Sequence, residues 1–115
     1  MRAQFRKDEQ VSIERRTGAK DPEFGADIEA WEVVADHIWA NAQDVLPSRG
    51  ESTANGMVTA VTRTRLRIDI DDRITTAMRV RLHGKGDRLM KIIAGPALLD
   101  DRRHMEFMLE GYSHG

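Results

Sequence analysis

Few residues of this sequence stand in patterns that bind phosphate or metal ions. The segment Gly84-Lys-Gly-Asp87 has the composition of a phosphate-binding loop. A P-loop needs Gly-x-x-x-x-Gly-Lys-Ser/Thr between a strand and a helix, so we interpret this segment as a hairpin turn. The segment Asp69-Ile-Asp71-Asp72 resembles the start of a calcium loop. Arg73, however, stands at the next ligand position, and Val80 stands where the bidentate glutamate belongs, so we predict no calcium site.

The histidines and serines form no recognisable catalytic pattern. The histidines lack the spacing of metal ligands, and we interpret each as a surface or core residue. No serine lies in Gly-x-Ser-x-Gly, and no nucleophile has an obvious base beside it. We therefore expect a protein that is not an enzyme and that has no catalytic residue, metal or cofactor. The histidines are His37, His83, His104 and His114.

A row of arginines is the one basic feature of note. Arg63, Arg65 and Arg67 alternate along the chain, and we expect Arg79 and Arg81 to extend the row. A solvated strand face is the simplest interpretation. The functional interpretations are a salt-bridge surface between subunits or a contact with DNA phosphates. No aromatic residue is interleaved with these arginines, which disfavours a base-stacking platform.

Two tryptophans, Trp31 and Trp39, lie eight residues apart in an apolar segment. The simplest interpretation places both in the core, and the alternative makes them anchors of a protein interface.

The first three arginines belong to a segment with a period of two. Over this length such a period predicts a strand with one buried and one exposed face. We expect Leu66 and Ile68 to be buried, and Arg65 and Arg67 to be exposed. The first face carries Val58, Ala60, Thr62, Thr64, Leu66, Ile68 and Ile70, and the second carries Thr59, Arg63, Arg65, Arg67 and Asp69.

Other segments also have the features of short strands, separated by turn signals. Residues 28–41 fit a strand with a bulge; Trp31, Val34, Ala35 and Ile38 also fit a helix, but the β-branched and aromatic content favours the strand. The remaining strands are expected at 11–15, 78–82, 89–94 and 105–109. We predict an all-β, mainly antiparallel fold, a small barrel or sandwich with a long projecting loop.

The loop between the two central strands is long and polar. It contains no apolar side chain larger than that of Ala54, so its burial cannot offset the entropy cost of ordering, and we expect it to be mobile in the free protein. Its residues are Ser48, Arg49, Gly50, Glu51, Ser52, Thr53, Ala54, Asn55 and Gly56.

The length of 115 residues predicts one domain over 1–115, with a flexible arm at 1–9 and a frayed tail at 111–115. The net charge of −1 argues against nonspecific capture by bulk DNA or an anionic membrane. Residues 1–60 carry 7 basic and 11 acidic side chains, whereas residues 61–115 carry 11 basic and 8 acidic. Two surfaces of opposite charge suit a protein that packs against other copies or other proteins, although chance also explains the asymmetry.

The chain contains no cysteine, which excludes disulfides and thiolate metal sites. It has no apolar run long enough to span a membrane and no secretory signal pattern, so we expect no membrane partner.

The order of these segments resembles the phage head–tail joining family, also called head closure or head completion proteins. The resemblance extends from about Val11 to Leu109. Its matching segments are Ile13-Glu-Arg15, Gly25, Trp31, Ile38-Trp39-Ala40, Arg49-Gly50-Glu51, Thr62-Arg63-Thr64, Leu66-Arg67-Ile68, Met78-Arg79-Val80, Ile92, Gly95 and Asp101-Arg102-Arg103. One departure is Met90-Lys91-Ile92, where the family often has an aromatic residue before the isoleucine.

The resemblance implies a structural virion protein with a small β-barrel. Such a protein forms a homo-oligomeric ring in the neck, between the portal and adaptor above and the tail terminator or tail tube protein below. The ring closes the DNA-filled head and receives the tail. Assembly takes place in the host cytoplasm, and the particle is a phage, a prophage or a gene-transfer particle.

In this family the long loop reaches into the channel and contacts packaged DNA without sequence specificity. Carried onto this chain, the channel or gating loop comprises residues 48–56, with Arg49 and Glu51 as the expected contacts. The alternative function is a small OB-like module that binds single-stranded nucleic acid; a small enzyme is a third possibility and lacks a catalytic pattern.

Overall fold

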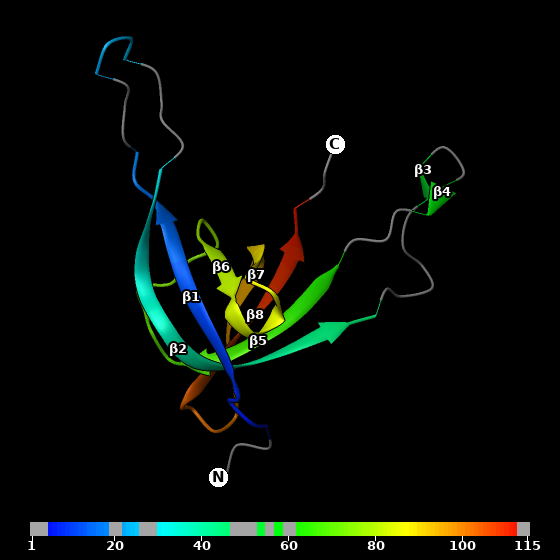
Figure 1. Cartoon of the computed structure of the whole chain (residues 1–115). Coiled ribbons are helices and arrows are strands. Elements are labelled where there is room, and N and C mark those ends of the chain that lie inside the picture. Colours follow the sequence, from blue (N-terminus) through cyan, green and yellow to red (C-terminus); the bar gives the residue numbers. More distant parts are fainter. Residues whose placement is uncertain are drawn as a thin grey trace.

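The computed structural model describes residues 5–18, 22–25, 30–46, 53–54, 57–58 and 62–112, the two dipeptides by their backbone. Six antiparallel strands form a closed barrel in the order β1-β2-β5-β8-β7-β6 (Figure 1). A single 3₁₀ turn, η1 (His83–Lys85), connects β6 to β7, and the described residues contain no α-helix. The predicted all-β antiparallel fold is therefore confirmed as a barrel. The six strands are β1 (Glu9–Arg16), β2 (Trp31–Val45), β5 (Arg63–Asp69), β6 (Arg79–Leu82), β7 (Arg88–Leu98) and β8 (His104–Gly111).

Strand β2 is the longest of the described strands, and its register against β1 shifts twice, between Val11 and Ile13 and between Ile13 and Glu14. It pairs with β1 over Trp31–Ala40 and with β5 over Asn41–Val45. Opposite Ser12 the register shifts, so that two residues of β2, Asp36 and His37, face one residue of β1. His37 has a φ of 48°, which is the left-handed conformation that such a bulge requires. The expected strand with a bulge is therefore correct, and the helical alternative is wrong.

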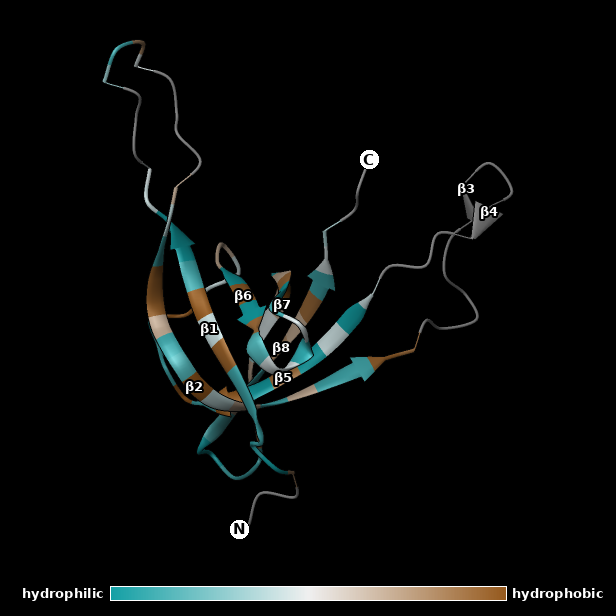
Figure 2. Ribbon diagram, in the orientation of Figure 1, coloured by the Kyte–Doolittle hydropathy of each residue, from teal (hydrophilic) through white to brown (hydrophobic). Residues whose placement is uncertain are grey.

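The period of two in β5 divides its side chains between the barrel interior and the outer surface. Leu66 is 0 % exposed and Ile68 is 1 % exposed, whereas Arg65 and Arg67 are half-buried on the outer face. The face assignment is thus confirmed, although the arginines are less exposed than expected. Hydrophobic and hydrophilic residues alternate along β1 and β5 in Figure 2.

The expected strand over 58–70 is too long at both ends. Val58 belongs to β4 (Met57–Val58), which pairs with β3 (Thr53–Ala54) in a separate two-stranded sheet. Ile70 follows the end of β5 and is 48 % exposed. Residues 59–61 lie outside the described residues.

The core of the barrel receives side chains from all six strands and from the segment between β5 and β6. Phe107 is the largest side chain that is fully buried. Close packing of these side chains excludes water from the barrel interior. The buried apolar residues are Val11, Ile13, Ala35, Ala40, Leu66, Ile68, Ile74, Val80, Leu82, Met90, Ile92, Met105, Phe107 and Leu109.

The tryptophans do not lie where the simplest interpretation placed them. Trp39 is 57 % exposed, and Trp31 is half-buried on the outer surface. The bulge explains Trp39, because Ala35 and Ala40 both face the core although they are an odd number of residues apart. The extra residue inverts the alternation, and Trp39 therefore points outward.

The described part of the expected N-terminal arm contacts the barrel. Lys7 Nζ lies 2.5 Å from Asp69 Oδ1, and Asn41 Nδ2 donates to the carbonyl oxygen of Arg6 at 2.9 Å. The ring of Phe5 packs edge-on against His104, with the ring centroids 5.0 Å apart. Residues 5–9 are thus anchored, whereas residues 1–4 lie outside the described residues.

At the other end of the chain, Gly111 is part of β8 rather than of a frayed tail. Its N–H donates to the carbonyl oxygen of Thr62 at 2.8 Å, and it pairs with Met90. No helix in the described ranges is long and apolar enough to cross a membrane.

We predict that Leu66→Ala lowers the free energy of unfolding by about 2–5 kcal/mol, because it leaves a cavity in a closed core. Ile70→Ala is the matched control, since half of this aliphatic side chain is exposed; its effect should stay below about 1 kcal/mol. Urea denaturation followed by tryptophan fluorescence measures both. Equal losses in the two variants would contradict the burial pattern of β5.

Candidate functional site

The arginines form two separate groups on the barrel. Arg63, Arg65 and Arg67 lie on β5, which has β2 and β8 as neighbours, whereas Arg79 and Arg81 lie on β6, between β1 and β7. Two strands separate β5 from β6 in either direction around the barrel. The expectation that Arg79 and Arg81 extend one row is therefore wrong. Sequence spacing did not reveal this, because the order of strands in a barrel depends on long-range pairing.

The β5 arginines interact with acidic residues on the neighbouring strand β8. Arg67 Nε donates to Glu106 Oε1 at 2.7 Å, and Arg65 Nε lies 3.8 Å from the same oxygen. Arg65 Nη2 also donates to Gln43 of β2 at 2.6 Å. These cross-strand contacts fix the guanidinium groups against the sheet.

At Arg63, the ion pairs of the β5 arginines extend across β8 to β7. Arg63 Nε lies 3.6 Å from Glu110 Oε2, and Lys91 Nζ lies 3.5 Å from Glu110 Oε1. One carboxylate thus lies between two cations, which leaves this part of the surface with an excess of positive charge.

The β6 arginines share a single, largely buried carboxylate. Glu14 of β1 is 8 % exposed and accepts a hydrogen bond from Arg79 Nε at 2.7 Å, while Arg81 Nε lies 3.5 Å from its other oxygen. The guanidinium carbon of Arg79 lies 4.0 Å from the centroid of the Trp31 ring, a cation–π contact. Arg79 is therefore held by a carboxylate and by an aromatic ring at the same time.

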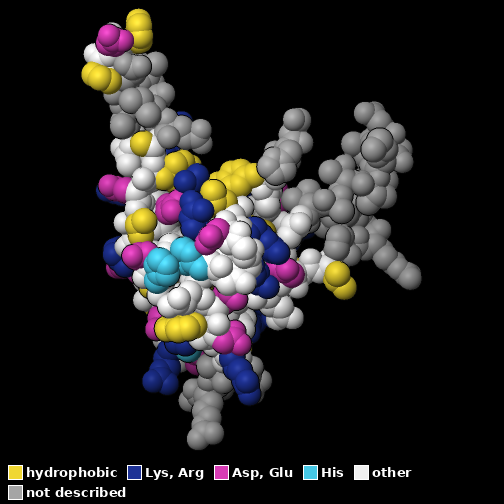
Figure 3. Space-filling model, in the orientation of Figure 1, with side chains coloured by type: hydrophobic (Ala, Val, Ile, Leu, Met, Phe, Trp, Pro, Cys, Tyr) yellow, Lys and Arg dark blue, Asp and Glu magenta, His cyan; other side chains and the backbone are white. Residues whose placement is uncertain are grey.

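These ion pairs limit which ligands the two arginine groups can bind. Blue and magenta side chains lie next to one another over the barrel surface in Figure 3. At the β6 group, a phosphate would compete with the Glu14 carboxylate, which already holds both arginines. The arrangement favours a structural role for the β6 group and offers no stacking platform of the kind used by single-strand binders.

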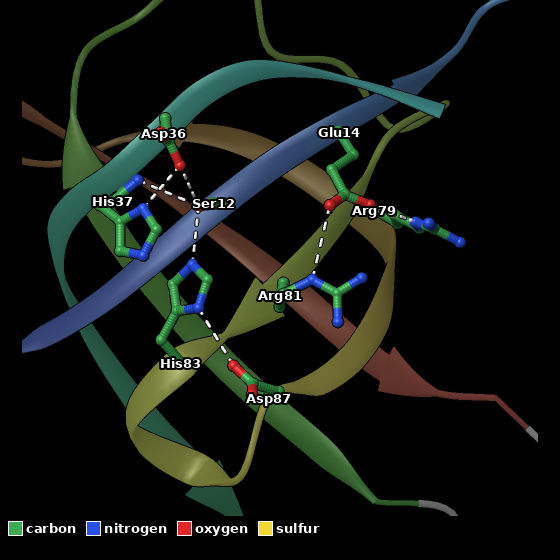
Figure 4. A network of polar contacts seen from close by, with 8 residues as sticks. All are labelled: Ser12, Glu14, Asp36, His37, Arg79, Arg81, His83 and Asp87. Carbon is green, nitrogen blue, oxygen red and sulfur yellow. Dashed lines mark hydrogen bonds and ion pairs between the residues drawn. The ribbon is translucent and has the colours of Figure 1, made fainter. Parts of the chain in front are cut away.

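A second polar network joins β1, β2 and η1 around Ser12 (Figure 4). Ser12 Oγ lies 3.1 Å from Asp36 Oδ1 and 2.7 Å from His83 Nε2, and it accepts a hydrogen bond from the backbone N–H of His37 at 3.0 Å. His83 Nδ1 lies 3.1 Å from Asp87 Oδ1. The rings of His37 and His83 stack, with centroids 4.0 Å apart and planes inclined by 7°.

Ser12, His83 and Asp87 stand in the order of a hydrolase triad, but their surroundings do not permit catalysis. Ser12 is 3 % exposed, so a substrate has no access to its Oγ. Its one hydroxyl hydrogen can be donated either to Asp36 or to His83, so the hydroxyl is already committed to structural contacts. The network instead holds the bulge of β2 against β1 and η1. No sequence signal could have revealed it, because its residues come from three distant segments.

A third polar group orders the turn between β7 and β8. The Asp101 carboxylate accepts hydrogen bonds from the backbone N–H groups of Arg103 at 2.9 Å and His104 at 3.1 Å, and it lies 2.6 Å from His104 Nδ1. The hydrogen bond from Arg103, together with those from His104, lowers the pKa of Asp101 below its ordinary value. Asp36 also has a pKa below its ordinary value. The main cause is its hydrogen bond with the His37 side chain, and the next is its hydrogen bond with the Ser12 side chain.

Among the described residues, no group of three or more histidine, aspartate or glutamate side chains is arranged to hold a metal ion. Most of the expected channel loop, residues 48–56, lies outside the described residues. Only Thr53 and Ala54 belong to a described element, the strand β3.

The described residues thus form a closed six-stranded barrel whose β5 and β6 arginines lie beside carboxylates on neighbouring strands. The sequence model of the phage head completion protein family matches residues 3–110, and the chain belongs to this family. The protein therefore has a structural role in the phage head, as a virion component that interacts with other head and tail components.

One solved structure shares the fold over nearly the whole chain. The solution structure of protein SF1141 from Shigella flexneri 2a superposes with a TM-score of 0.70 at 20 % sequence identity and covers 96 % of each chain. No curated protein matches the chain in sequence.

We predict that Glu14→Gln destabilises the barrel by about 1–3 kcal/mol, because it leaves Arg79 without its anionic partner beside a buried strand. Glu32→Gln is the matched control, since Glu32 of β2 pairs with Arg15 of β1 at an exposed position, and its effect should be below about 1 kcal/mol. Thermal unfolding monitored by circular dichroism compares the two. A smaller loss for Glu14→Gln than for Glu32→Gln would contradict the role assigned to Glu14.

The depressed aspartate pKa values predict that acid destabilises the protein. A carboxyl group with a lower pKa in the folded state stabilises it above the unfolded pKa, near pH 4, and this contribution disappears as the pH falls through the folded pKa. We expect Asp101→Asn to be less stable than the wild type at pH 7 and to lose less stability between pH 5 and pH 2. Chemical denaturation at several pH values measures this slope, with Asp100→Asn in the same turn as the control. Parallel curves for Asp101→Asn and the wild type would refute the assignment.

Proposed function

We propose that this protein closes the DNA-filled head of a tailed phage or related particle. In this role, copies form a ring in the neck beneath the portal and its adaptor, and the tail terminator or tail tube protein docks below. Membership of the phage head completion family is the observation that carries the proposal.

The connection between β2 and β5 supports this role. The two strands are antiparallel neighbours, so residues 46–62 leave and return at one end of the barrel. The β3–β4 hairpin within this connection stands away from the barrel (Figure 1). A closed barrel is a rigid base for a projection, and in a ring several such projections would converge on the axis. We therefore propose that residues 48–56 form the channel loop, with Arg49 and Glu51 contacting a neighbouring loop or DNA.

The β5 arginines support a contact with packaged DNA or with a neighbouring subunit. Three arginines share two glutamates with Lys91, so the β5–β8–β7 surface has a net positive charge. Such a charge attracts phosphates without reading a base sequence. The OB-like alternative is less well supported, because the β5 and β6 arginines lie beside carboxylates on neighbouring strands.

Shortening the loop tests the gating part of the proposal. We predict that deletion of Ala54–Gly56, and to a smaller extent Arg49→Ala, causes loss of DNA from tail-less heads that carry the variant. Deletion of Glu23–Gly25, in the connection between β1 and β2, is the matched control and should preserve DNA retention. Nuclease protection of the packaged genome measures the result. Full retention with the shortened loop would exclude gating and leave this segment at most a docking role.

A further inference from the structure

The hydroxyl group of Ser12 carries fewer hydrogens than its surroundings can accept (Figure 4). Its Oγ lies 3.1 Å from Asp36 Oδ1 and 2.7 Å from His83 Nε2, and it accepts a hydrogen bond from the backbone N–H of His37. A hydroxyl group donates one hydrogen and accepts two. Whether the contacts with Asp36 and His83 are both hydrogen bonds therefore depends on which nitrogen atoms of His83 carry a hydrogen.

Asp87 fixes the tautomer of His83 while the imidazole is neutral. Asp87 Oδ1 lies 3.1 Å from His83 Nδ1, and an ionised carboxylate only accepts hydrogen bonds. The hydrogen of a neutral His83 is therefore on Nδ1, and Nε2 accepts the hydroxyl hydrogen of Ser12. Asp36 then receives no hydrogen from Ser12, although it keeps its contact with His37 Nδ1 at 2.6 Å.

A second hydrogen on the His83 ring completes the network. Both ring nitrogens then donate, Nδ1 to Asp87 and Nε2 to Ser12 Oγ. The hydroxyl hydrogen of Ser12 turns to Asp36, because the hydroxyl oxygen now accepts from His83. A continuous chain of hydrogen bonds then connects Asp87, His83, Ser12 and Asp36, and the three distances between them all fit it.

This chain connects two elements that are far apart in sequence. His83 is the first residue of η1, and Asp36 belongs to the bulge of β2. Ser12 lies between them on β1 and is 3 % exposed. Hydrogen bonds at a position so well shielded from water are stronger than exposed ones. The charge of one imidazole thus decides whether η1 and the bulge are joined.

The other charged groups of the neighbouring elements do not compete for the His83 ring. Arg81 Nε lies 3.5 Å from a carboxylate oxygen of Glu14, and the two cations next to η1 lie beside Asp44. The carboxylate of Glu9 lies over the backbone of Gly84 and adds a negative charge near η1. These groups are Glu9 and Glu14 of β1, Arg81 of β6, Lys85 of η1 and Arg88 of β7.

The ring of His37 limits the charge that this site accepts. It stacks on the ring of His83, with the centroids 4.0 Å apart. Two positive rings at this distance would repel each other. The complete network therefore combines a charged His83 with a neutral His37, whose Nδ1–H donates to Asp36.

We propose that His83 acts as a proton-operated lock between the η1 turn and the bulge of β2. With a neutral ring, Ser12 donates to His83, and the bulge is held to Ser12 through the backbone N–H of His37. With a charged ring, Ser12 donates to Asp36, and one chain of hydrogen bonds ties η1 to the bulge. Imidazole groups change charge between about pH 5 and pH 8, so the lock operates in this range. The lock involves only the folded monomer and is independent of the head-closure proposal.

Nuclear magnetic resonance of the isotope-labelled wild-type protein tests this lock. Long-range proton–nitrogen spectra of the imidazole rings distinguish the two neutral tautomers from the charged form. We expect His83 to be the Nδ1–H tautomer at about pH 8 and to be charged at about pH 5. Over the same interval, hydrogen exchange of the His37 amide, corrected for its intrinsic pH dependence, should slow by about threefold or more. The amide of Gly111, which donates to Thr62, is the internal reference and should not change.

Two variants separate the lock from a general effect of acid. His83→Gln has a side chain that does not titrate, so it should abolish the pH dependence of the His37 amide. Asp87→Asn removes the carboxylate that accepts from Nδ1 and should move this dependence to more acidic pH. Asparagine also tolerates the left-handed backbone of residue 87, where φ is 55°. Asp100→Asn is the matched control, since Asp100 is also exposed but lies in the turn between β7 and β8.

Several results would overturn the proposal. They are an Nε2–H tautomer of His83 at pH 8, a ring that stays neutral at pH 5, and a His37 amide whose exchange does not slow while His83 becomes charged. Persistence of the pH dependence in His83→Gln would do the same. If His83→Gln does not fold, Asp87→Asn decides: a pH dependence identical to that of Asp100→Asn would exclude the lock.

Discussion

Strand β1 pairs with β2 along one edge and with β6 along the other, and this double pairing closes the barrel. Its inner residues, Val11 and Ile13, lie in the core, while its outer residues carry the polar contacts that hold both neighbours. Ser12 binds the bulge of β2, and Glu14 binds the arginines of β6. The same four residues thus join the apolar core to the two polar networks. Closure removes the free strand edges at this point and makes the barrel a rigid base.

The bulge at Asp36 and His37 has consequences along the whole of β2. It inverts the alternation of side chains, which brings Ala40 into the core and turns Trp39 to the surface. A large aromatic ring thereby lies on the surface instead of in the core. The bend also allows one strand to pair with β1 first and with β5 afterwards.

The order of strands in the barrel decides which charged side chains lie together, more than their positions in the sequence do. The β6 arginines, Arg79 and Arg81, serve a nearly buried glutamate and stabilise the closure of the barrel, whereas the β5 arginines lie on a surface with excess positive charge.

The sequence by itself determined the all-β class and the two faces of β5, since the direction of a side chain in a regular strand depends on local backbone geometry. Leu66 and Ile68 were placed correctly for this reason, and the order of short segments was sufficient to predict the family. The tertiary structure decided what depends on pairing between distant segments: the separation of Arg79 from Arg63, the outward position of Trp39, and the Ser12 network. A bulge shifts the alternation by one residue only when a partner strand supplies the contacts that hold it, and those contacts come from residues that lie far apart in sequence.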